Sequence, residues 1–583
     1  MRRLAKMDGR RQKTRARGNR TTRKSRAVVV PASDATGARA RVLFVAAALL
    51  TVTVIAYLPA IRGDFVWDDD DHVSNNLTLR SAEGLRAIWL DPAATPQYYP
   101  LVHTSFWIEY RLWGLAPAGY HITNILLHAA GAILLWRVLL LLSVPGAWVV
   151  AMIFAVHPVH VESVAWITER KNVLSGVFYL SAMLAYLKVA LDAPPGGEHG
   201  RWLRRYALAC VLFLLALLSK TVTATLPAAL LLLILWKRRR ILARDIWLLL
   251  PLVVVGATMA AITVWLERHH VGAQGIDWQL SPLERCVIAG RALWFYAHTL
   301  VWPANLAFSY PRWHIDAADL GQLAYPLAAA GVVVVLWLAR HRIGAGPLVA
   351  VLLFVGTLVP ALGFFDVFPM RYSFVADHFQ YLASIGLIAL AVSAGVRLLD
   401  RWPPARAHAA LALALVLVPV LATLTWRHTH VFADHETLWR DTVEKYPASW
   451  MAHTTLGALL GRRGELRDAE SHYREAVRLN PDFSTARINL GGLLANQGRF
   501  DEAIPQMREA VRLEPGSLEP YISLGRALLL NGQSDEAVIW LRQAAAGWPQ
   551  DARGQALLEE ALRVQRERGS PPGDALTAGR ERR

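Results

Sequence analysis

A run of four aspartates is the feature of the sequence that most suggests chemistry. Residues 68–71 follow Trp67 and precede His72, shortly after the first long apolar segment of the chain. Carboxylates this close oppose one another's ionisation, so they persist at low cost only beside a cation, a metal ion or the protons of a reaction. A solvated acidic loop or a helix N-cap is the competing interpretation. The run is therefore the first place to expect chemistry.

Three later segments also carry ionisable side chains beside apolar runs. These are His157, His160, Glu162 and Arg170 in the first segment, Lys220 in the second, and Arg371, Asp377, His378 and Tyr381 in the third. Ionisable groups at membrane depth are expensive and usually line a cavity, so such groups on one side of a membrane indicate a shared pocket. For any single one of them, a snorkelling side chain that contacts lipid headgroups is the alternative. Their joint placement favours the pocket.

A metal site is a weaker hypothesis. His157 and His160 are three residues apart and would make a ligand pair, but Pro158 between them interrupts a regular helical face. A divalent metal ion is therefore an open possibility, its identity is unknown, and no other cofactor is indicated. Cys210 and Cys286 form no CxxC pair, so they predict neither a disulfide framework nor a zinc site.

The elements that must position these residues are membrane-spanning helices. Hydrophobic residues make up 54% of the 583 residues and the mean hydropathy is +0.29, too apolar for an ordinary soluble enzyme. A further apolar run over residues 286–303 contains Arg291 and His298 and is expected to enter the membrane without crossing it. The chain is thus predicted to be all-α and polytopic, with about eleven spans that begin near residues 42, 119, 146, 172, 203, 222, 246, 324, 346, 378 and 407.

The charge pattern orients these spans. Residues 1–41 hold fourteen Lys and Arg against Asp8 and Asp34, so the positive-inside rule makes them a basic cytoplasmic arm. A nucleic-acid-binding tail is the alternative, which the adjacent apolar segment disfavours. Eleven crossings then put everything after about Trp426 outside. The external loops would be residues 61–118, 157–171, 219–221, 267–323 and 363–377.

A repeat pattern follows the last span. Pro447, Pro481, Pro515 and Pro549 recur at a spacing of 34 residues, and Gly457, Gly491 and Gly525 recur between them. Small residues where paired helices approach, with a proline after each second helix, are the tetratricopeptide pattern. We therefore expect an α-solenoid, with a linker or helix over residues 427–449, three repeats over 450–551, a capping helix over 552–568 and a disordered tail over 569–583.

The chain resembles a known family. The matching segments are residues 63–69, 120–128, 157–166 and 377–386, together with the repeats after the last span. They resemble the transmembrane and tetratricopeptide-repeat-containing O-mannosyltransferases and their bacterial relatives, within the GT-C superfamily of polytopic glycosyltransferases. The resemblance covers roughly residues 42–551. It implies a GT-C-type membrane domain over residues 42–426 and a place in a bacterial inner membrane.

The resemblance also implies a reaction. Such enzymes transfer a sugar from a polyprenyl-phosphate donor to a protein or glycan hydroxyl on the external face. An acidic residue of their first external loop lies near the membrane, so Asp68 or Asp69 is the expected general base, and the other aspartate would orient the acceptor or a metal ion. Fixed cations would stabilise the departing phosphate. The expected donor-binding residues are Lys220, Arg371, Asp377, His378 and Tyr381, with His157, His160, Glu162 and Arg170 in support.

Two departures from the family pattern keep other functions open. Family members often carry Lys-Glu where this chain has Lys220 and Thr221, and Glu-Arg where it has Asp377 and His378. The candidates to replace the missing arginine are His378, Arg371 and Lys220. A non-catalytic membrane scaffold is the first alternative, and a transporter of lipid-linked glycans is the second. The repeats are expected to recruit the acceptor or protein partners, and no nucleic acid partner is expected.

Overall fold

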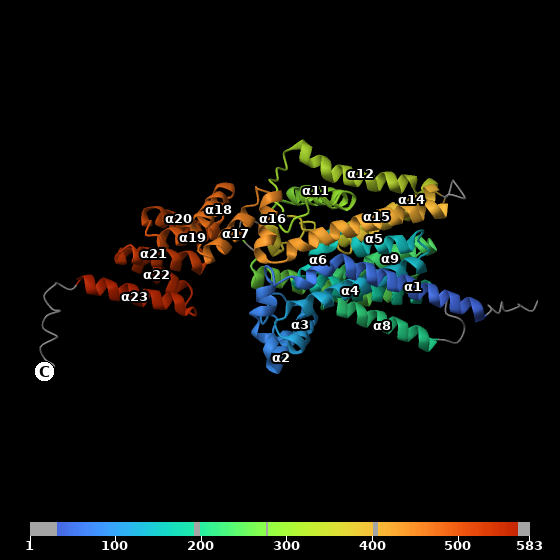
Figure 1. Cartoon of the computed structure of the whole chain (residues 1–583), viewed down its shortest axis with the longest axis horizontal. Coiled ribbons are helices and arrows are strands. Elements are labelled where there is room, and N and C mark those ends of the chain that lie inside the picture. Colours follow the sequence, from blue (N-terminus) through green and yellow to red (C-terminus); the bar gives the residue numbers. More distant parts are fainter. Residues whose placement is uncertain (1–31, 192–198, 274, 276–277, 400–405, 570–583) are drawn as a thin grey trace, which may run out of the picture. The chain divides into compact units, whose positions relative to one another are not determined.

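The computed structural model describes residues 32–191, 199–273, 275, 278–399 and 406–569. Within these residues every regular element is a helix, which confirms the predicted all-α class (Figure 1). The chain divides into two compact units, Met1–Ala47 and Ala48–Arg583. The contacts described below all lie within the second unit.

Fifteen α-helices in the described part of the chain lie before residue 430. They are α1 (Ala32–Tyr57), α2 (Ala82–Leu90), α3 (Pro100–Trp113), α4 (Pro117–Leu141), α5 (Ala147–Val156), α6 (Val161–Ala165), α7 (Arg170–Leu191), α8 (His199–Leu217), α9 (Leu226–Arg238), α10 (Ala243–Leu266), α11 (Pro282–Val301), α12 (Leu320–Ile343), α13 (Gly346–Leu358), α14 (Ser384–Leu399) and α15 (Arg406–Thr429). Proline stands in the first turn of α3, α4, α9 and α11, where its fixed φ and missing N–H favour a helix start.

Six helices in the described part of the chain are long and apolar enough to cross a membrane. They span Arg39–Arg62, Pro117–Leu141, Ile167–Leu191, Thr221–Arg238, Ala243–Val271 and Leu320–Ile343. The pair Ala147–Val156 and Pro158–Ala165, bent by 56°, would make a seventh, and Gly346–Ala361 and Ser384–Leu399 are shorter apolar helices. Each of the eleven predicted runs contains an α-helix. Eleven crossings nevertheless remain a prediction, because the other helices are shorter or less apolar.

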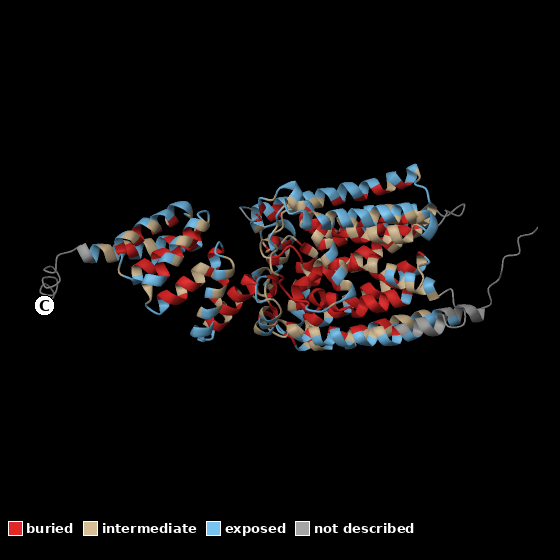
Figure 2. Cartoon of the chain, turned by 90° about the horizontal axis from the view of Figure 1, so that it is seen from above, coloured by how far each residue is buried: buried red, intermediate tan, exposed pale blue. Residues whose placement is uncertain are grey.

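The exposed apolar surface of α12 indicates that these helices lie in a membrane. None of its residues is buried, and the side chains of Val335 and Leu338 are 63% and 62% exposed. Figure 2 shows buried residues concentrated in the interior helices and exposed residues along the peripheral ones. Apolar surface on this scale is unfavourable in water and is accommodated by lipid. The chain is a membrane protein.

The repeat region consists of paired helices. After α16 (His435–Lys445), the helix pairs are α17 (Trp450–Arg462) with α18 (Leu466–Leu479), α19 (Ser484–Asn496) with α20 (Phe500–Leu513), and α21 (Leu518–Leu530) with α22 (Ser534–Gly547). The last helix is α23 (Ala552–Gly569), at the place of the predicted cap. A Cβ on Gly525 would lie 2.5 Å from the Leu541 side chain, so the helices pair this closely only with glycine there. Most of the predicted arm and tail, residues 1–31 and 570–583, lies outside the described residues.

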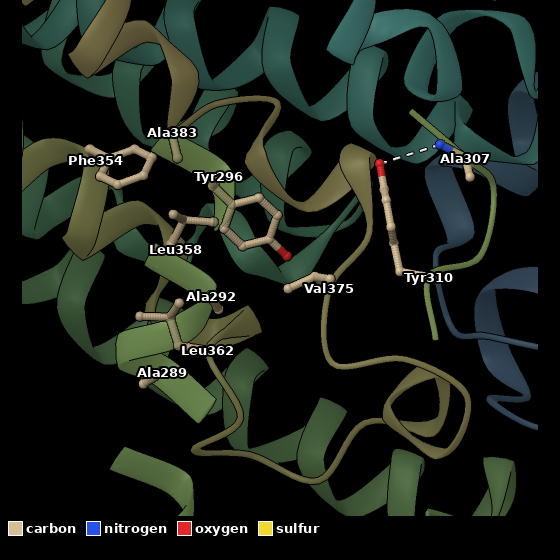
Figure 3. Packing of buried hydrophobic residues seen from close by; sticks show 10 residues of the cluster. All are labelled: Ala289, Ala292, Tyr296, Ala307, Tyr310, Phe354, Leu358, Leu362, Val375 and Ala383. Carbon is tan, nitrogen blue, oxygen red and sulfur yellow. Dashed lines mark hydrogen bonds between the residues drawn. The ribbon is translucent and has the colours of Figure 1, made fainter. Parts of the chain in front are cut away.

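A buried cluster fixes the loop that precedes α14. Tyr296 of α11 and Tyr310 of the following loop pack with Phe354 and Leu358 of α13 and with Val375 (Figure 3). The Tyr310 hydroxyl also accepts a hydrogen bond from the Ala307 backbone N–H at 3.3 Å. Aromatic rings and a hydrogen bond hold this segment from several sides. The residues just after Val375 are therefore held on a rigid support.

The predicted orientation of the spans can be tested with reporter fusions. A phosphatase reporter that is active only outside the cytoplasm is expected to be active after Phe432 and inactive after Leu191, because the basic loops belong inside. Whole-cell reporter activity, normalised to fusion abundance on a blot, measures this. An inactive but abundant fusion after Phe432 would place the repeats in the cytoplasm and contradict the assignment.

Candidate active site

Asp69 is a buried anchor. Its side chain is fully buried, and its Oδ2 accepts a hydrogen bond from the Val66 N–H at 2.8 Å. Its Oδ1 accepts from the Thr168 N–H at 2.7 Å and from the Thr168 hydroxyl at 2.5 Å. Burial and the adjacent Asp68 carboxylate raise the pKa of Asp69 to about 8 despite these hydrogen bonds. Asp69 therefore ties the first loop to the start of the span that contains α7.

Asp68 is more exposed than Asp69 and has fewer hydrogen-bond partners. Its side chain is 27% exposed and its Oδ2 lies 3.6 Å from His72 Nε2, while its Oδ1 has no hydrogen-bond partner among the described residues. Burial raises the pKa of Asp68 to about 6, and the nearby Lys171 opposes that rise. Burial also lowers the pKa of His72 to about 3, so its ring is neutral at neutral pH. Asp68 is therefore a partly exposed carboxylate whose Oδ1 is itself buried without a hydrogen-bond partner among the described residues.

The backbone directly before Asp68 is strained at Trp67. This residue has a φ of 53°, in the left-handed region that bulky side chains rarely adopt. Its ring packs edge-on against Trp439 with centroids 5.1 Å apart, and against Phe308 at 6.1 Å. These aromatic contacts stabilise the unusual backbone conformation of Trp67. Trp67 lies between Val66, whose N–H binds Asp69, and Asp68.

A network of charges surrounds Glu169. This carboxylate is fully buried, and it forms ion pairs of 3.1 Å with Lys171 and with Lys220, which lies in the hairpin between α8 and α9. The Lys220 ammonium also donates to the Asn172 side-chain oxygen at 2.9 Å. Burial lowers the pKa of Lys220, and Glu169 opposes that change. Glu169 therefore holds one buried lysine, Lys171, and one half-buried lysine, Lys220, and Lys171 lies close enough to Asp68 to act on its pKa.

His378 joins this network from the loop before α14. Its Nδ1 lies 2.9 Å from Glu162 Oε1 and its Nε2 lies 3.8 Å from Glu169 Oε1. Its backbone N–H donates to Glu162 Oε2 at 2.8 Å, and its carbonyl accepts from the Asn172 amide at 2.9 Å. The structure thus brings four predicted site residues into one region: Asp68, Glu162, Lys220 and His378.

Other predicted site residues pack around that region. Arg170 is fully buried and forms a bidentate pair with Glu109 at 2.8 and 3.1 Å. The Tyr310 hydroxyl donates to Asp377 at 3.0 Å, and burial raises the pKa of Asp377 well above its usual value. The Tyr381 hydroxyl lies 2.9 Å from His128 Nδ1. These contacts are internal, so they position the site and leave no charge free for a phosphate.

Arg371 lies apart from the lysines. Its guanidinium forms an ion pair with Glu514, in the repeat region. The aromatic ring of Tyr372 next to it packs against Trp450 with centroids 5.7 Å apart. Arg371 therefore links a loop of the membrane part to the repeats, a role that its position in the sequence did not indicate.

The histidine pair does not form a metal site. His157 Nε2 lies 3.0 Å from the Leu300 carbonyl oxygen, and both ring nitrogens of His160 are engaged, by the Phe154 carbonyl and the Ser384 hydroxyl. No group of three or more His, Cys, Asp and Glu side chains in the described part of the chain is arranged to hold a metal ion. The two histidines tie the bend between α5 and α6 to its neighbours.

The predicted set of site residues left out Glu169, Lys171 and Asn172. They lie within two residues of Arg170, which was predicted because of its charge. In the structure Arg170 pairs with Glu109, whereas Glu169 and Asn172 contact Lys220. Residues three apart at a helix start share a face, so Glu169 with Asn172 was a detectable signal. Only its charge pointed to Lys171 in the sequence.

An apolar cavity lies between α4, α7, α9, α13 and α14. Its volume is about 450 Å³, and its lining runs from Tyr179, Thr357 and Leu382 to Trp236 and Arg397. Leu382 follows Tyr381 in the loop that carries His378. A long apolar ligand would find matching surface here.

Comparison with known proteins agrees with this architecture. Two tetratricopeptide repeat family models match residues 454–518 and 494–561. A protein O-mannosyl-transferase of Caenorhabditis elegans is 26% identical over 445 residues, which cover 72% of this chain and 61% of that protein. Human protein O-mannosyl-transferase TMTC4 is 30% identical over 174 residues, 26% of this chain and 24% of the relative. Mouse TMTC3 is 31% identical over 150 residues, 24% of this chain and 16% of the relative.

The chain therefore spans about three fifths of the length of the nematode relative and a quarter or less of the two mammalian ones. The match to the nematode protein extends well beyond the repeats, since it covers most of this chain. The resemblance expected from the sequence is thereby confirmed: this is a tetratricopeptide-repeat membrane protein homologous to the proteins named protein O-mannosyl-transferase, the TMTC proteins among them.

Proposed function

We propose that the chain is an integral-membrane glycosyltransferase of the GT-C type. It transfers a sugar, mannose by analogy with the names of its relatives, from a polyprenyl-phosphate donor to a protein or glycan hydroxyl on the external face of a bacterial inner membrane. The observation that carries the proposal is the placement of Asp68, a partly exposed carboxylate close to Lys171, which shares the Glu169 carboxylate with Lys220. A base and an anion site this close suit transfer from a phosphate to a hydroxyl.

Asp68 is the proposed general base. The acceptor oxygen attacks the anomeric carbon and forms the new glycosidic bond, while its proton passes to the Asp68 carboxylate. The bond from the anomeric carbon to the phosphate oxygen breaks, and polyprenyl phosphate leaves with the electron pair. Asp69 is unsuited to this step, because it is fully buried and its oxygens bind Val66 and Thr168.

Lys171 and Lys220 are the proposed stabilisers of the leaving phosphate. Charge develops on that group in the transition state, and fixed cations in a water-poor site lower its energy. Glu169 holds both ammonium groups in place, so little reorganisation is needed when the donor binds. His378, held by Glu162 at 2.9 Å, extends the site where the family pattern has an arginine.

The apolar cavity offers a place for the lipid of the donor. Its volume of about 450 Å³ and its lining by side chains such as Tyr179 and Leu382 suit an isoprenoid chain. A scaffold without catalytic function would not need the unpaired carboxylate oxygen of Asp68 close to Lys171, because such groups are costly to bury. This cost favours the enzyme over the scaffold.

The two aspartates are expected to respond differently to the same substitution. Asp68→Asn keeps the shape but removes the base, and should lower the transfer rate about 10² to 10⁴-fold with an unchanged melting temperature. Asp69→Asn presents an amide donor to one of its N–H partners and should lower the free energy of unfolding by about 1–3 kcal/mol. Transfer from a synthetic polyprenyl-phosphate mannose and thermal unfolding in detergent measure the two effects. A fully active Asp68→Asn protein would refute the base.

The rate should depend on pH through Asp68. Because the pKa of Asp68 is raised to about 6, the base is ionised above that pH and protonated below it. We expect kcat/KM to rise between about pH 5 and 7 and then to level off. An initial-rate profile of the purified chain between these limits measures this limb. A flat profile in a stable protein would contradict a titrating base.

Substitutions of Lys220 and Arg371 are expected to affect use of the donor differently. Lys220→Ala should lower kcat/KM for the donor on the order of 10²-fold, because it removes a charge that faces the leaving phosphate. Arg371→Ala is the matched control: it removes a cation that is paired with Glu514, and donor kinetics with a small soluble acceptor should change less than about twofold. The reverse order of effects would assign the phosphate to Arg371.

A further inference from the structure

Helix α16 lies in the segment that the sequence analysis assigns to a linker, but the turn before it is joined to the first loop. The backbone N–H of Asp64 donates a hydrogen bond to the Ala433 carbonyl oxygen at 2.9 Å. A Cβ on Gly63 would lie 3.0 Å from the Phe432 carbonyl oxygen, so glycine allows the two backbones to approach this closely. The start of α16 is therefore tied to the start of the first loop through the backbone.

The other end of α16 is fixed on a second loop, between α11 and α12. Lys445 donates from its Nζ to the Leu306 carbonyl oxygen at 2.8 Å, and the Tyr446 hydroxyl donates to the Asn305 carbonyl oxygen at 3.0 Å. The ring of Tyr446 also packs edge-on against Tyr310 with centroids 5.3 Å apart. Because both of its ends are held, α16 cannot shift along the two loops without breaking these contacts.

Trp439 of α16 contacts both loops through aromatic rings. Its side chain is fully buried. Its ring packs edge-on against Trp67 of the first loop and against Phe308 of the second, with centroids 5.1 and 5.2 Å apart. The ring of Phe308 also packs against Trp166, two residues before Thr168, at 5.0 Å. Trp439 therefore lies where α16 meets both loops.

The contact with Trp439 has a consequence for Asp68 because of the backbone of Trp67. The φ of 53° at Trp67 is costly for a residue with a Cβ and persists only where surrounding contacts impose it. Asp68 follows directly in the chain, so a return of Trp67 to a negative φ would redirect the backbone that carries the Asp68 carboxylate. A side chain that holds Trp67 thus also holds Asp68.

We propose that Trp439 is a positioning residue for the proposed base: it holds Trp67 in the left-handed conformation and thereby fixes the Asp68 carboxylate. The inference rests on the proposed function of Asp68. It makes α16 a part of the site's support, although α16 leads directly into the repeats. Glu436 of α16 forms an ion pair with Arg463, at the end of α17, so one helix contacts both the support of the base and the first repeat.

Hydrogen exchange and kinetics of the purified full chain in detergent test the role of Trp439. In Trp439→Ala we expect the backbone amides of residues 64–72 to exchange on the order of tenfold faster. With a synthetic polyprenyl-phosphate mannose and a small hydroxyl acceptor, kcat should fall on the order of tenfold while KM for the donor changes less than about twofold. Trp439→Phe keeps an aromatic ring and should restore most of both properties. If Trp439→Ala does not fold, Trp439→Leu, which keeps more of the apolar volume, replaces it.

A double variant tests the conformational mechanism. Glycine adopts a φ of 53° without strain, so Trp67→Gly removes the need for the ring of Trp439. Adding Trp439→Ala to Trp67→Gly should therefore change kcat and the exchange rate less than about twofold further. Full multiplication of the two single effects would overturn the proposal, because Trp439 would then act independently of Trp67.

The control is Trp450→Ala, which removes an equally large buried ring that packs against Tyr372 and Phe483. It should leave kcat with the small acceptor and the exchange of residues 64–72 within about twofold of wild type. Thermal unfolding shows which variants are folded. A folded Trp439→Ala with the wild-type kcat, or an equal loss in Trp450→Ala, would refute the positioning role alone. A wild-type chain that transfers no sugar would refute the proposed base and this role with it.

Discussion

The ion pairs of Glu169 are the interaction on which the arrangement of the site depends. A fully buried carboxylate is strongly unfavourable unless cations and hydrogen bonds compensate for its lost hydration. Here Lys171 and Lys220 supply two contacts of 3.1 Å, the second from 51 residues further along the chain. Removing either lysine would leave a buried charge poorly compensated, so the hairpin of Lys220 is bound to the start of α7 by electrostatics as much as by packing.

The residues around Glu169 extend this control to the end of the bundle that carries the first loop. Five consecutive residues, 168–172, each contact a residue elsewhere in the chain, Lys171 through the side-chain oxygen of Gln97. Thr168 holds Asp69, Arg170 holds Glu109, and Asn172 holds the carbonyl of His378. The segment is short and helical, so its side chains diverge at fixed angles. One rigid element thereby sets the distance between the proposed base and the proposed cation site.

The features that could be predicted from the sequence are those that a local sequence pattern encodes. The repeats appeared in register because proline and glycine recur at positions where a larger side chain would collide, as Leu541 would with any Cβ on residue 525. The acidic run, Lys220 and His378 were singled out by charge beside apolar runs. The choice between Asp68 and Asp69 needed the contacts of Thr168, and the placement of Arg371 needed the position of Glu514. Both depend on contacts between residues far apart in sequence, which no local spacing records.

The central claim is that sugar leaves a polyprenyl phosphate as it joins a hydroxyl in the region of Asp68. The most direct test follows both products of a single reaction by mass spectrometry, with the purified full chain, a synthetic polyprenyl-phosphate mannose and a hydroxyl acceptor. The account predicts one molecule of polyprenyl phosphate released for each glycosidic bond formed. Bound donor that remains intact in a folded protein, with acceptors of every class tested, would contradict it.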